Sequence, residues 1–203
     1  MIKNIIFDFG DIFIDLDKPA TQLQMMRFGY EGLSTKVLKL AMDYEQGLVT
    51  TDSFITNMIK FFPKATKKDL IMAWNAIIRY FPDYRLEFIE NLATTKRYRL
   101  FLLSNTNALH IDQVKHNMGV EKYQRFKNCF EQFYLSHEIN LRKPNAEIYQ
   151  FVLRENGLEA KETFFVDDTK ENTLAAERLG IRSWNLKVGQ EDVIDLNLKL
   201  NYV

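Results

Sequence analysis

The fold is decided near the N-terminus by the stretch Ile5-Ile6-Phe7-Asp8-Phe9-Gly10-Asp11. A short apolar run that ends in an acidic, glycine-bearing turn predicts a buried strand over residues 5–9 rather than an amphipathic helix. Asp8 therefore stands at the carboxyl end of the first strand. In an open parallel sheet, ligands bind at this end of the strands.

Similar apolar runs follow and predict four more strands, at residues 99–103, 130–135, 163–166 and 181–186. Helical patterns lie among these strands, at residues 84–96, 108–118, 146–156 and 170–179. Glycine directly follows the last three patterns, and it ends a helix favourably because it adopts the left-handed conformation at little cost. This alternation predicts the α/β class, with a Rossmann-like parallel sheet covered by helices on both faces.

Residues 18–82 interrupt the alternation, because they contain helical patterns and no convincing strand. The clearest helix start is Thr66-Lys67-Lys68-Asp69, a capping box with Asp in place of Glu. The apolar residues that recur there at helical spacing are Leu70, Ile71, Trp74, Ile77 and Ile78. We predict a small all-helical cap domain at 18–82, inserted after the first strand of a core domain formed by 1–17 and 83–203.

Composition narrows the partners and the location. The 203 residues carry 27 Lys+Arg and 27 Asp+Glu, a balance that argues against a nucleic-acid partner. No apolar run approaches the ~18 residues of a membrane span, so we expect no membrane partner. The single cysteine, Cys129, and an N-terminus unlike a signal peptide favour the reducing cytoplasm. The 16 Phe and 9 Tyr could fill a core or an interface, which leaves the oligomeric state open.

Four polar clusters stand at predicted strand ends or just after them: Asp8, Ser104-Asn105-Thr106, Arg142-Lys143-Pro144 and Asp167-Asp168. Each alone has an ordinary explanation as a turn, a helix cap or a surface charge. Together they suit phosphate chemistry, because carboxylates hold a hard cation such as Mg²⁺, while a hydroxyl, backbone amides and a lysine cradle phosphate. A carboxylate that also attacks phosphorus would give an aspartyl-phosphate intermediate.

In this order, the clusters make the sequence resemble the haloacid dehalogenase-like (HAD) hydrolase superfamily, most of all its bacterial alpha-D-glucose-1-phosphate phosphatase branch. The motifs that carry the resemblance are Phe7-Asp8-Phe9-Gly10-Asp11, Leu103-Ser104-Asn105-Thr106-Asn107, Leu141-Arg142-Lys143-Pro144 and Phe164-Phe165-Val166-Asp167-Asp168. They span nearly the whole chain, and the helical insertion is similar to that family's small cap.

The resemblance implies a role for each residue. Asp8 would be the nucleophile and a Mg²⁺ ligand, with the Gly10 carbonyl and the Asp168 carboxylate as further ligands. Asp167 would ligate the metal directly or through water, and Asn172 would support the metal shell unless it is an exposed helix residue. Ser104 and the amide of Asn105 would hold the phosphoryl group. Lys143 would neutralise that group and orient Asp8.

Gly10 departs from most phosphatases of the superfamily, which carry there an Asp that acts as general acid and base. Losing such help costs ~10²–10⁴-fold in rate. The glucose-1-phosphate branch also has Gly here, and an anomeric hydroxyl leaves more easily than an ordinary alkoxide. A cap residue, a substrate hydroxyl or an ordered water could supply the proton transfer instead. The nearest candidates are Asp11, Asp43 and Glu45, each of which has an ordinary explanation as a solvated carboxylate.

These features predict a Mg²⁺-dependent phosphomonoesterase that acts on a small phosphorylated metabolite, first of all a sugar 1-phosphate, through an aspartyl-phosphate. One alternative is a phosphometabolite-binding or regulatory protein without turnover. The others are a dehalogenase, which needs no Mg²⁺, and a phosphonatase, which needs a Schiff-base lysine in the cap such as Lys18, Lys36, Lys39 or Lys60. Because His110, His116 and His137 lack metal-ligand spacing, we do not expect zinc.

Overall fold

The computed structural model describes residues 1–29 and 34–201. Its sheet has five parallel strands in the order β3-β2-β1-β4-β5. They are β1 (Asn4–Phe7), β2 (Arg99–Ser104), β3 (Gln132–Leu135), β4 (Thr163–Asp167) and β5 (Arg182–Asn185). The predicted α/β class and all five strands are confirmed. Because β1 lies at the centre of the sheet, its carboxyl end places Asp8 between the ends of β2 and β4.

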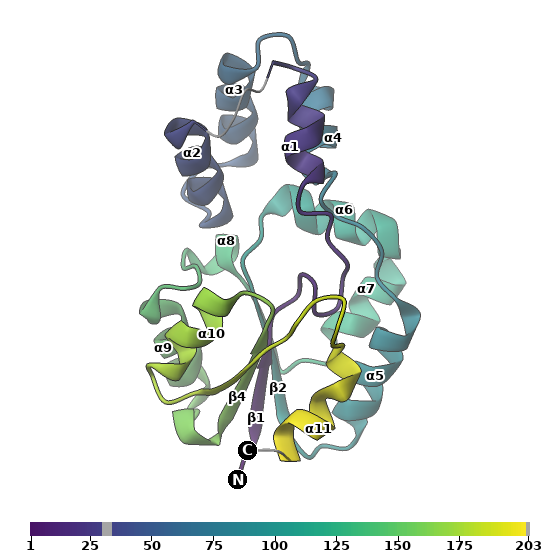
Figure 1. Cartoon of the computed structure of the whole chain (residues 1–203), viewed down its shortest axis with the longest axis vertical. Helices are drawn as coiled ribbons and strands as arrows, with labels where there is room; N and C mark the ends of the chain where they lie inside the picture. Colours follow the sequence, from purple (N-terminus) through teal and green to yellow (C-terminus); the bar gives the residue numbers. More distant parts are fainter. Residues whose placement is uncertain (30–33, 202–203) are drawn as a thin grey trace.

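Helices cover both faces of the sheet, as the alternation of side chains along β1 requires. Ile5 and Phe7 belong to one hydrophobic cluster and Ile6 to another. The first cluster packs against α5 (Asp83–Thr94), α6 (Ala108–Met118), α7 (Val120–Lys127) and α11 (Leu196–Asn201). The second packs against α9 (Ala146–Asn156) and α10 (Lys170–Glu177) (Figure 1). The remaining short elements are α8 (Ser136–Ile139), η1 (Ala160–Glu162) and η2 (Val193–Asp195).

Phenylalanine rings fill the space beneath the loop that follows β1. The ring of Phe126 on α7 is fully buried, and its centroid lies 5.0 Å from those of Phe13, Phe81 and Phe130. Phe9, the residue after Asp8, stacks on Phe126 at 5.3 Å. The aromatic residues of this region therefore build the core, and they anchor the chain on the far side of Asp8. The sequence did not reveal α7, whose many charged residues mask its two buried aromatic residues, Tyr123 and Phe126.

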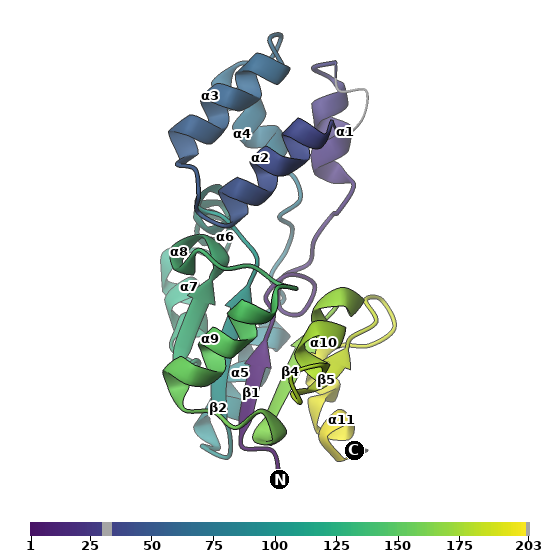
Figure 2. The same ribbon diagram turned by 90° about the vertical axis from the view of Figure 1, so that its left-hand side faces the viewer.

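The segment between β1 and α5 forms four helices: α1 (Ala20–Met26), α2 (Thr35–Glu45), α3 (Thr51–Phe61) and α4 (Lys67–Asn75). We call them the helical insertion. Their apolar residues form a separate cluster that includes Phe54 and Trp74. Figures 1 and 2 show the insertion beyond the carboxyl ends of the strands. The capping box of Thr66 and Asp69 is present as predicted. The boundaries of the cap domain at 18–82 stay a prediction.

Two linkers connect the helical insertion to the sheet, and they run side by side. Asp15 N–H donates to the Tyr80 carbonyl at 2.8 Å, and Asp17 N–H donates to the Ile77 carbonyl at 2.9 Å. Ile78 forms an isolated antiparallel bridge with Leu16. Ile77 and Ile78 were expected to continue the helical pattern, but α4 ends at Asn75 because the chain pairs here with the outgoing linker. Among the described residues, no helix is both long and apolar enough to cross a bilayer.

Candidate active site

Asp8 begins a tight loop above the centre of the sheet. Its N–H continues the β1–β4 pairing by donating to the Val166 carbonyl at 2.8 Å. The loop turns at Asp11, whose φ of 54° is left-handed and whose Oδ1 accepts the N–H of Leu16 at 3.0 Å. A Cβ added to Gly10 would lie 2.7 Å from Cδ1 of Leu16. Position 10 therefore has no room for a side chain unless that of Leu16 moves.

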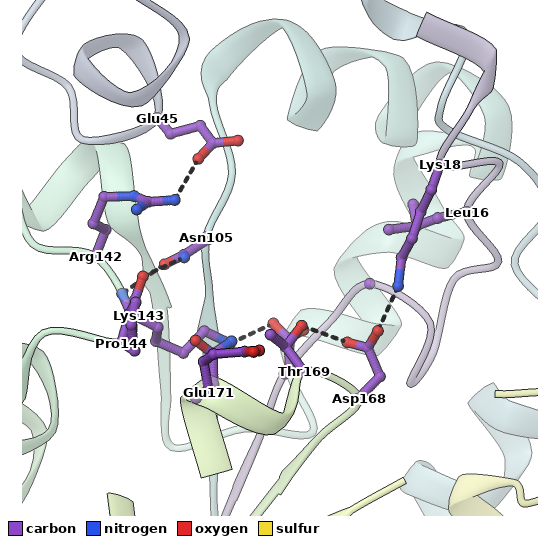
Figure 3. A pocket seen from close by; sticks show the side chains of 13 residues that line it. Leu16, Lys18, Glu45, Asn105, Arg142, Lys143, Pro144, Asp168, Thr169 and Glu171 are labelled. Carbon is purple, nitrogen blue, oxygen red and sulfur yellow. Dashed lines mark hydrogen bonds and ion pairs between the residues drawn. The ribbon is translucent and has the colours of Figure 1, made fainter. Parts of the chain in front are cut away.

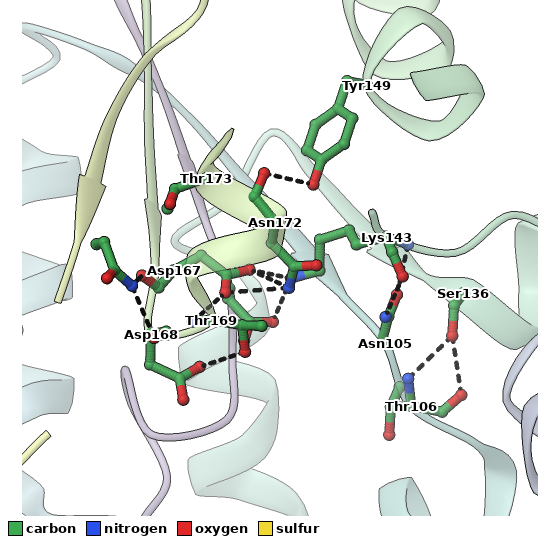
Figure 4. Close-up of polar contacts among 12 residues, drawn as sticks. Asn105, Thr106, Ser136, Lys143, Tyr149, Asp167, Asp168, Thr169, Asn172 and Thr173 are labelled. Atoms are coloured by element: carbon green, nitrogen blue, oxygen red, sulfur yellow. Dashed lines mark hydrogen bonds and ion pairs between the residues drawn. The ribbon is translucent and has the colours of Figure 1, made fainter. Parts of the chain in front are cut away.

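Lys143 forms ion pairs with one aspartate from each of two other predicted clusters. Its side chain is buried, and its Nζ lies 2.7 Å from Oδ1 of Asp8 and 2.7 Å from Oδ2 of Asp167. Burial opposes the charge, but the two carboxylates outweigh it and raise the pKa of the Lys143 ammonium. Asn105 fixes the Lys143 backbone, because its amide side chain donates to the Lys143 carbonyl and accepts the Lys143 N–H, each at 2.9 Å (Figure 4).

Asp167 is fully buried and surrounded by donors. Asn172 Nδ2 donates to both of its carboxylate oxygens, at 3.1 and 3.0 Å, and the N–H of Thr169 donates to Oδ1 at 2.8 Å (Figure 4). Asn172 is thus a buried partner of the acidic cluster rather than an exposed helix residue. These contacts, together with Lys143, hold Asp167 in one orientation.

The acidic cluster has the composition of a site for a hard cation. Carboxylate oxygens of Asp8, Asp167 and Asp168 lie within 4.8 Å of one another. Burial and the neighbouring carboxylates together outweigh the opposing effect of Lys143 and raise the pKa of Asp8 to about 7. A cation held by these oxygens would favour the ionised form, and Mg²⁺ prefers such ligands. The residues therefore fit the predicted metal.

Lys18 approaches the same cluster from the linker that leads to α1. Its Nζ lies 2.6 Å from Oδ2 of Asp168 and 2.8 Å from Oδ2 of Asp11. Burial disfavours its charge, but the hydrogen bonds to Asp11 and Asp168 prevail and raise the pKa of Lys18. Its ammonium is thereby kept protonated beside the carboxylates.

A main cavity of about 440 Å³ opens above these groups, between the sheet and the helical insertion (Figure 3). Asp8, Gly10, Lys143 and Asp168 line it, together with Glu45 from the far side. A side cavity of about 180 Å³ adjoins it and is lined by Ser104. Gly10, Glu45 and Asn105 border both cavities. The structure therefore brings the four predicted clusters to one place, with Ser104 turned toward the side cavity.

The three candidate acids have different surroundings. At the base of the linker, the carboxylate of Asp11 accepts the N–H of Leu16 and forms an ion pair with Lys18. Asp43 forms an ion pair with Lys39 along α2, with contacts of 2.8 and 2.9 Å, and does not line either cavity. Glu45, at the last position of α2, lines both. Of the three, Glu45 is the one that lines these cavities.

Contacts to the core hold Glu45 in place, and the sequence did not reveal most of them. Arg142 Nη2 lies 3.1 Å from Oε2 of Glu45, and the Ser136 hydroxyl donates to the Glu45 carbonyl at 2.5 Å. Burial raises the pKa of Glu45, and Arg142 opposes this shift without cancelling it. Arg142 was visible beside Lys143 in the sequence. Ser136 was visible only as a serine at the end of β3, which is a weak signal.

His110 belongs to the contact between the helical insertion and the core rather than to a metal site. Its ring stacks on that of Trp74 at 5.3 Å, and its Nε2 lies 3.2 Å from the Trp74 carbonyl. Burial lowers the pKa of His110 to about 4, so the ring is neutral at pH 7. No described histidine joins the acidic cluster.

Comparisons with known proteins agree with this arrangement. The family model of haloacid dehalogenase-like hydrolases matches residues 5–186. The chain is 26% identical to a Bacteroides thetaiotaomicron protein named D-ribitol-5-phosphate phosphatase, over 99% of this chain and 100% of that protein. The solved structure of a HAD family enzyme from the same organism, in complex with magnesium, is 32% identical and superposes with a TM-score of 0.81 over 94% of this chain and 96% of that one.

Two further structures extend the likeness. The B. thetaiotaomicron enzyme has also been solved with magnesium and inorganic phosphate, at 31% identity and a TM-score of 0.80 over 94% of this chain and 97% of that one. A predicted HAD-like family hydrolase from Porphyromonas gingivalis is 26% identical, with a TM-score of 0.82 over 100% of this chain and 99% of that one. The chain belongs to the haloacid dehalogenase-like hydrolase family.

Proposed function

We propose that this enzyme is a Mg²⁺-dependent phosphomonoesterase that works through an aspartyl-phosphate on Asp8. The observation that carries the proposal is the buried ammonium of Lys143, 2.7 Å from both Asp8 and Asp167, at the floor of the main cavity. An anionic nucleophile can approach an anionic phosphate only where positive charge offsets their repulsion. Lys143 supplies part of that charge, and its contact with Oδ1 of Asp8 leaves Oδ2 to attack phosphorus.

The remaining roles follow from position. Asp8, Asp168 and the carbonyl of Gly10 would hold Mg²⁺, whose charge would polarise the phosphoryl oxygens. Asp167 accepts hydrogen bonds on both oxygens, so it orients Lys143 rather than serving as the principal ligand. The hydroxyl of Ser104 and the amide of Asn105 would hold the transferring phosphoryl group. We also infer that residues 18–82 act as a cap that encloses the leaving group.

A phosphorylated polyol is the first substrate to test. The support is the B. thetaiotaomicron relative named D-ribitol-5-phosphate phosphatase, which matches over the whole length of both chains. The main cavity is lined by charged and amide side chains, which suits a leaving group rich in hydroxyls. A sugar 1-phosphate stays a prediction, and the resemblance to the glucose-1-phosphate phosphatase branch does not decide between the two.

The alternative activities have less support. A Schiff base needs a neutral amine, whereas the amine of Lys18, which reaches the main cavity, is held as an ammonium by Asp11 and Asp168. A solved L-2-haloacid dehalogenase is 18% identical with a TM-score of 0.62, which shows a shared fold alone. Dehalogenases need no Mg²⁺, so the acidic cluster favours phosphate chemistry over carbon–halogen hydrolysis.

The test is phosphate release from D-ribitol 5-phosphate, glucose 1-phosphate, glucose 6-phosphate and p-nitrophenyl phosphate, each with Mg²⁺ or with EDTA. We expect release with Mg²⁺ only, and its loss in Asp8→Asn. A folded protein that binds phosphate but releases none, and that beryllium fluoride with Mg²⁺ does not modify at Asp8, would instead be a binding or regulatory protein.

A further inference from the structure

The core residues next to Asp8, Gly10 and Lys143, supply no proton to the leaving oxygen. Gly10 has no side chain, and Leu16 Cδ1 occupies the space that a side chain there would enter. When the bond from phosphorus to oxygen breaks in a polyol 5-phosphate, the polyol leaves as a primary alkoxide, which is a poor leaving group without a proton. Lys143 is a poor proton donor, because its ammonium is paired with Asp8 and Asp167 and its pKa is raised. If the proposed phosphatase function holds, another residue donates this proton.

We propose that Glu45 is this catalytic acid and base, supplied by the helical insertion in place of a side chain at position 10. The proposal rests on the proposed function. Glu45 borders both the main cavity and the side cavity, as Gly10 does. It therefore faces the volume above Asp8 that the leaving group must occupy. Figure 3 shows its carboxyl group across the cavity from Lys143.

Other carboxylates around the cavity suit the role less well. Asp168 is paired with Lys18 and belongs to the acidic cluster. Glu171 lies on the first turn of α10, is exposed, and borders the main cavity without bordering the side cavity. The Glu45 side chain, by contrast, is 27% exposed and lies next to the space above Gly10.

The core fixes the position of Glu45 although the residue belongs to the insertion. Its backbone carbonyl accepts the Ser136 hydroxyl, and Gln46 and Asn140 exchange two hydrogen bonds of 3.0 Å between side chain and backbone. Gly47 packs so closely that an added Cβ would lie 2.1 Å from the His137 carbonyl oxygen. Three consecutive residues, 45 to 47, thus contact α8 or Asn140, the residue that follows α8. A residue that merely covered the site would not need such contacts.

Arg142 orients the carboxyl group of Glu45, and this group can still carry a proton. Arg142 Nη2 contacts Oε2 of Glu45 at 3.1 Å, and Figure 3 shows the other carboxylate oxygen pointing away from Arg142. Burial raises the pKa of Glu45 despite this contact, a shift in the direction that a proton donor requires. Arg142 also precedes Lys143 directly, so the arginine that orients Glu45 and the lysine that orients Asp8 come from one loop.

Protons and bonds balance over the cycle. Asp8 Oδ2 forms a bond to phosphorus as the bond from phosphorus to the alcohol oxygen breaks, and Glu45 gives its proton to that oxygen. Water then attacks phosphorus and gives a proton to the Glu45 carboxylate, while the bond to Asp8 breaks. Inorganic phosphate and ionised Asp8 result, and Glu45 is protonated again.

The test compares wild type, Glu45→Gln and the control Asp43→Asn on two substrates. Asp43 lies on the same helix, paired with Lys39 away from both cavities. D-ribitol 5-phosphate must release an alkoxide, whereas p-nitrophenyl phosphate releases a phenolate that needs no proton. We expect Glu45→Gln to lower kcat/KM by ~10²–10⁴-fold for the first substrate and by no more than a few-fold for the second. Asp43→Asn should match wild type on both.

Each outcome decides the matter. An equal loss on both substrates, or no loss on either, would overturn the proposal for Glu45 while the wild-type rates still established the phosphatase. A wild type without activity on any phosphomonoester would overturn the proposed function itself, and the proposal for Glu45 with it. Thermal unfolding of each variant excludes a folding defect. As a second measurement, Glu45→Ala should regain activity on D-ribitol 5-phosphate when acetate is added, and absence of rescue would count against proton transfer.

Discussion

The Nζ atom of Lys143 lies 2.7 Å from Oδ1 of Asp8, in a contact where the lysine side chain is 1% exposed and the aspartate side chain 12%. Removal of a partner from a buried ion pair leaves a charge without compensation, which costs about 3–5 kcal/mol. We therefore expect Lys143→Met to lower the free energy of unfolding in EDTA by about that amount and to abolish phosphate release. Urea denaturation measures the first effect.

Lys67→Met is the control for this stability effect, because the Lys67 side chain is 60% exposed and that of its partner Asp52 is 88% exposed. Ion pairs of exposed residues contribute about 0–1 kcal/mol. Equal destabilisation by the two substitutions would show that burial of Lys143 does not govern its contribution.

The metal-free protein should lose stability as the pH rises through the range in which Asp8 ionises. Burial raises the pKa of Asp8 from 3.8 to about 7 in the folded state, so the folded chain binds more protons than the unfolded chain between these values. The stability that protonated Asp8 contributes is complete below about pH 4 and is lost as the pH rises toward 7.

Asp8→Asn removes this titration. Urea denaturation in EDTA at several pH values should show wild type falling relative to Asp8→Asn between pH 4 and 7, and a constant difference would contradict the raised pKa. His110 titrates in both proteins, so the comparison cancels its contribution.

Mg²⁺ should stabilise the folded protein through the acidic cluster. A ligand that binds only the folded state at 100 times its Kd adds about 2.7 kcal/mol to stability. We expect Tm to rise with Mg²⁺ concentration in wild type and to stay nearly constant in Asp168→Asn, as measured by differential scanning calorimetry. A full Mg²⁺-dependent rise in Asp168→Asn would remove Asp168 from the set of ligands.

Gly47 should be intolerant of any side chain. Its φ is 70°, and an added Cβ would lie 2.1 Å from the backbone oxygen of His137. Gly189 provides a matched control, because its φ is 78° and nothing lies within 4 Å of an added Cβ. We expect Gly189→Ala to cost about 1–2 kcal/mol from backbone strain alone.

Gly47→Ala should cost clearly more than this control and should also displace Glu45, which lowers kcat/KM by ~10²-fold through misplacement of the reacting groups. Thermal unfolding and steady-state kinetics give the two readouts. If the two substitutions had equal effects on stability and on kcat/KM, the close approach of Gly47 to α8 would contribute to neither.

Much of the site was predictable because a parallel sheet brings the carboxyl ends of its strands together. Once Asp8, Lys143 and Asp167 were placed at strand ends or in the loops that follow them, their proximity followed from topology. The partners of each side chain did not follow. Asp167 and Asp168 are adjacent in sequence, yet one contacts Lys143 and the other Lys18, a difference that depends on where the linkers run.

The helical insertion was predictable in type but not in orientation. Helical spacing identified the segment that begins at Thr66, but it does not say where a helix packs. Asp43 and Glu45 are two positions apart on α2 and point to different surroundings, because the contact of Gln46 with Asn140 sets the end of that helix against the core. Choosing between the two carboxylates therefore required long-range contacts that local sequence patterns do not contain.

The claim at the centre of this account is that Asp8 becomes phosphorylated. The most direct measurement is borohydride reduction of the enzyme, quenched in acid during turnover of p-nitrophenyl phosphate, followed by mass spectrometry of its peptides. Reduction converts an aspartyl-phosphate to homoserine. We predict homoserine at position 8 in the presence of Mg²⁺, and none in EDTA or in Asp8→Asn. Phosphate release with Asp8 unmodified, or with homoserine at another aspartate, would contradict the account.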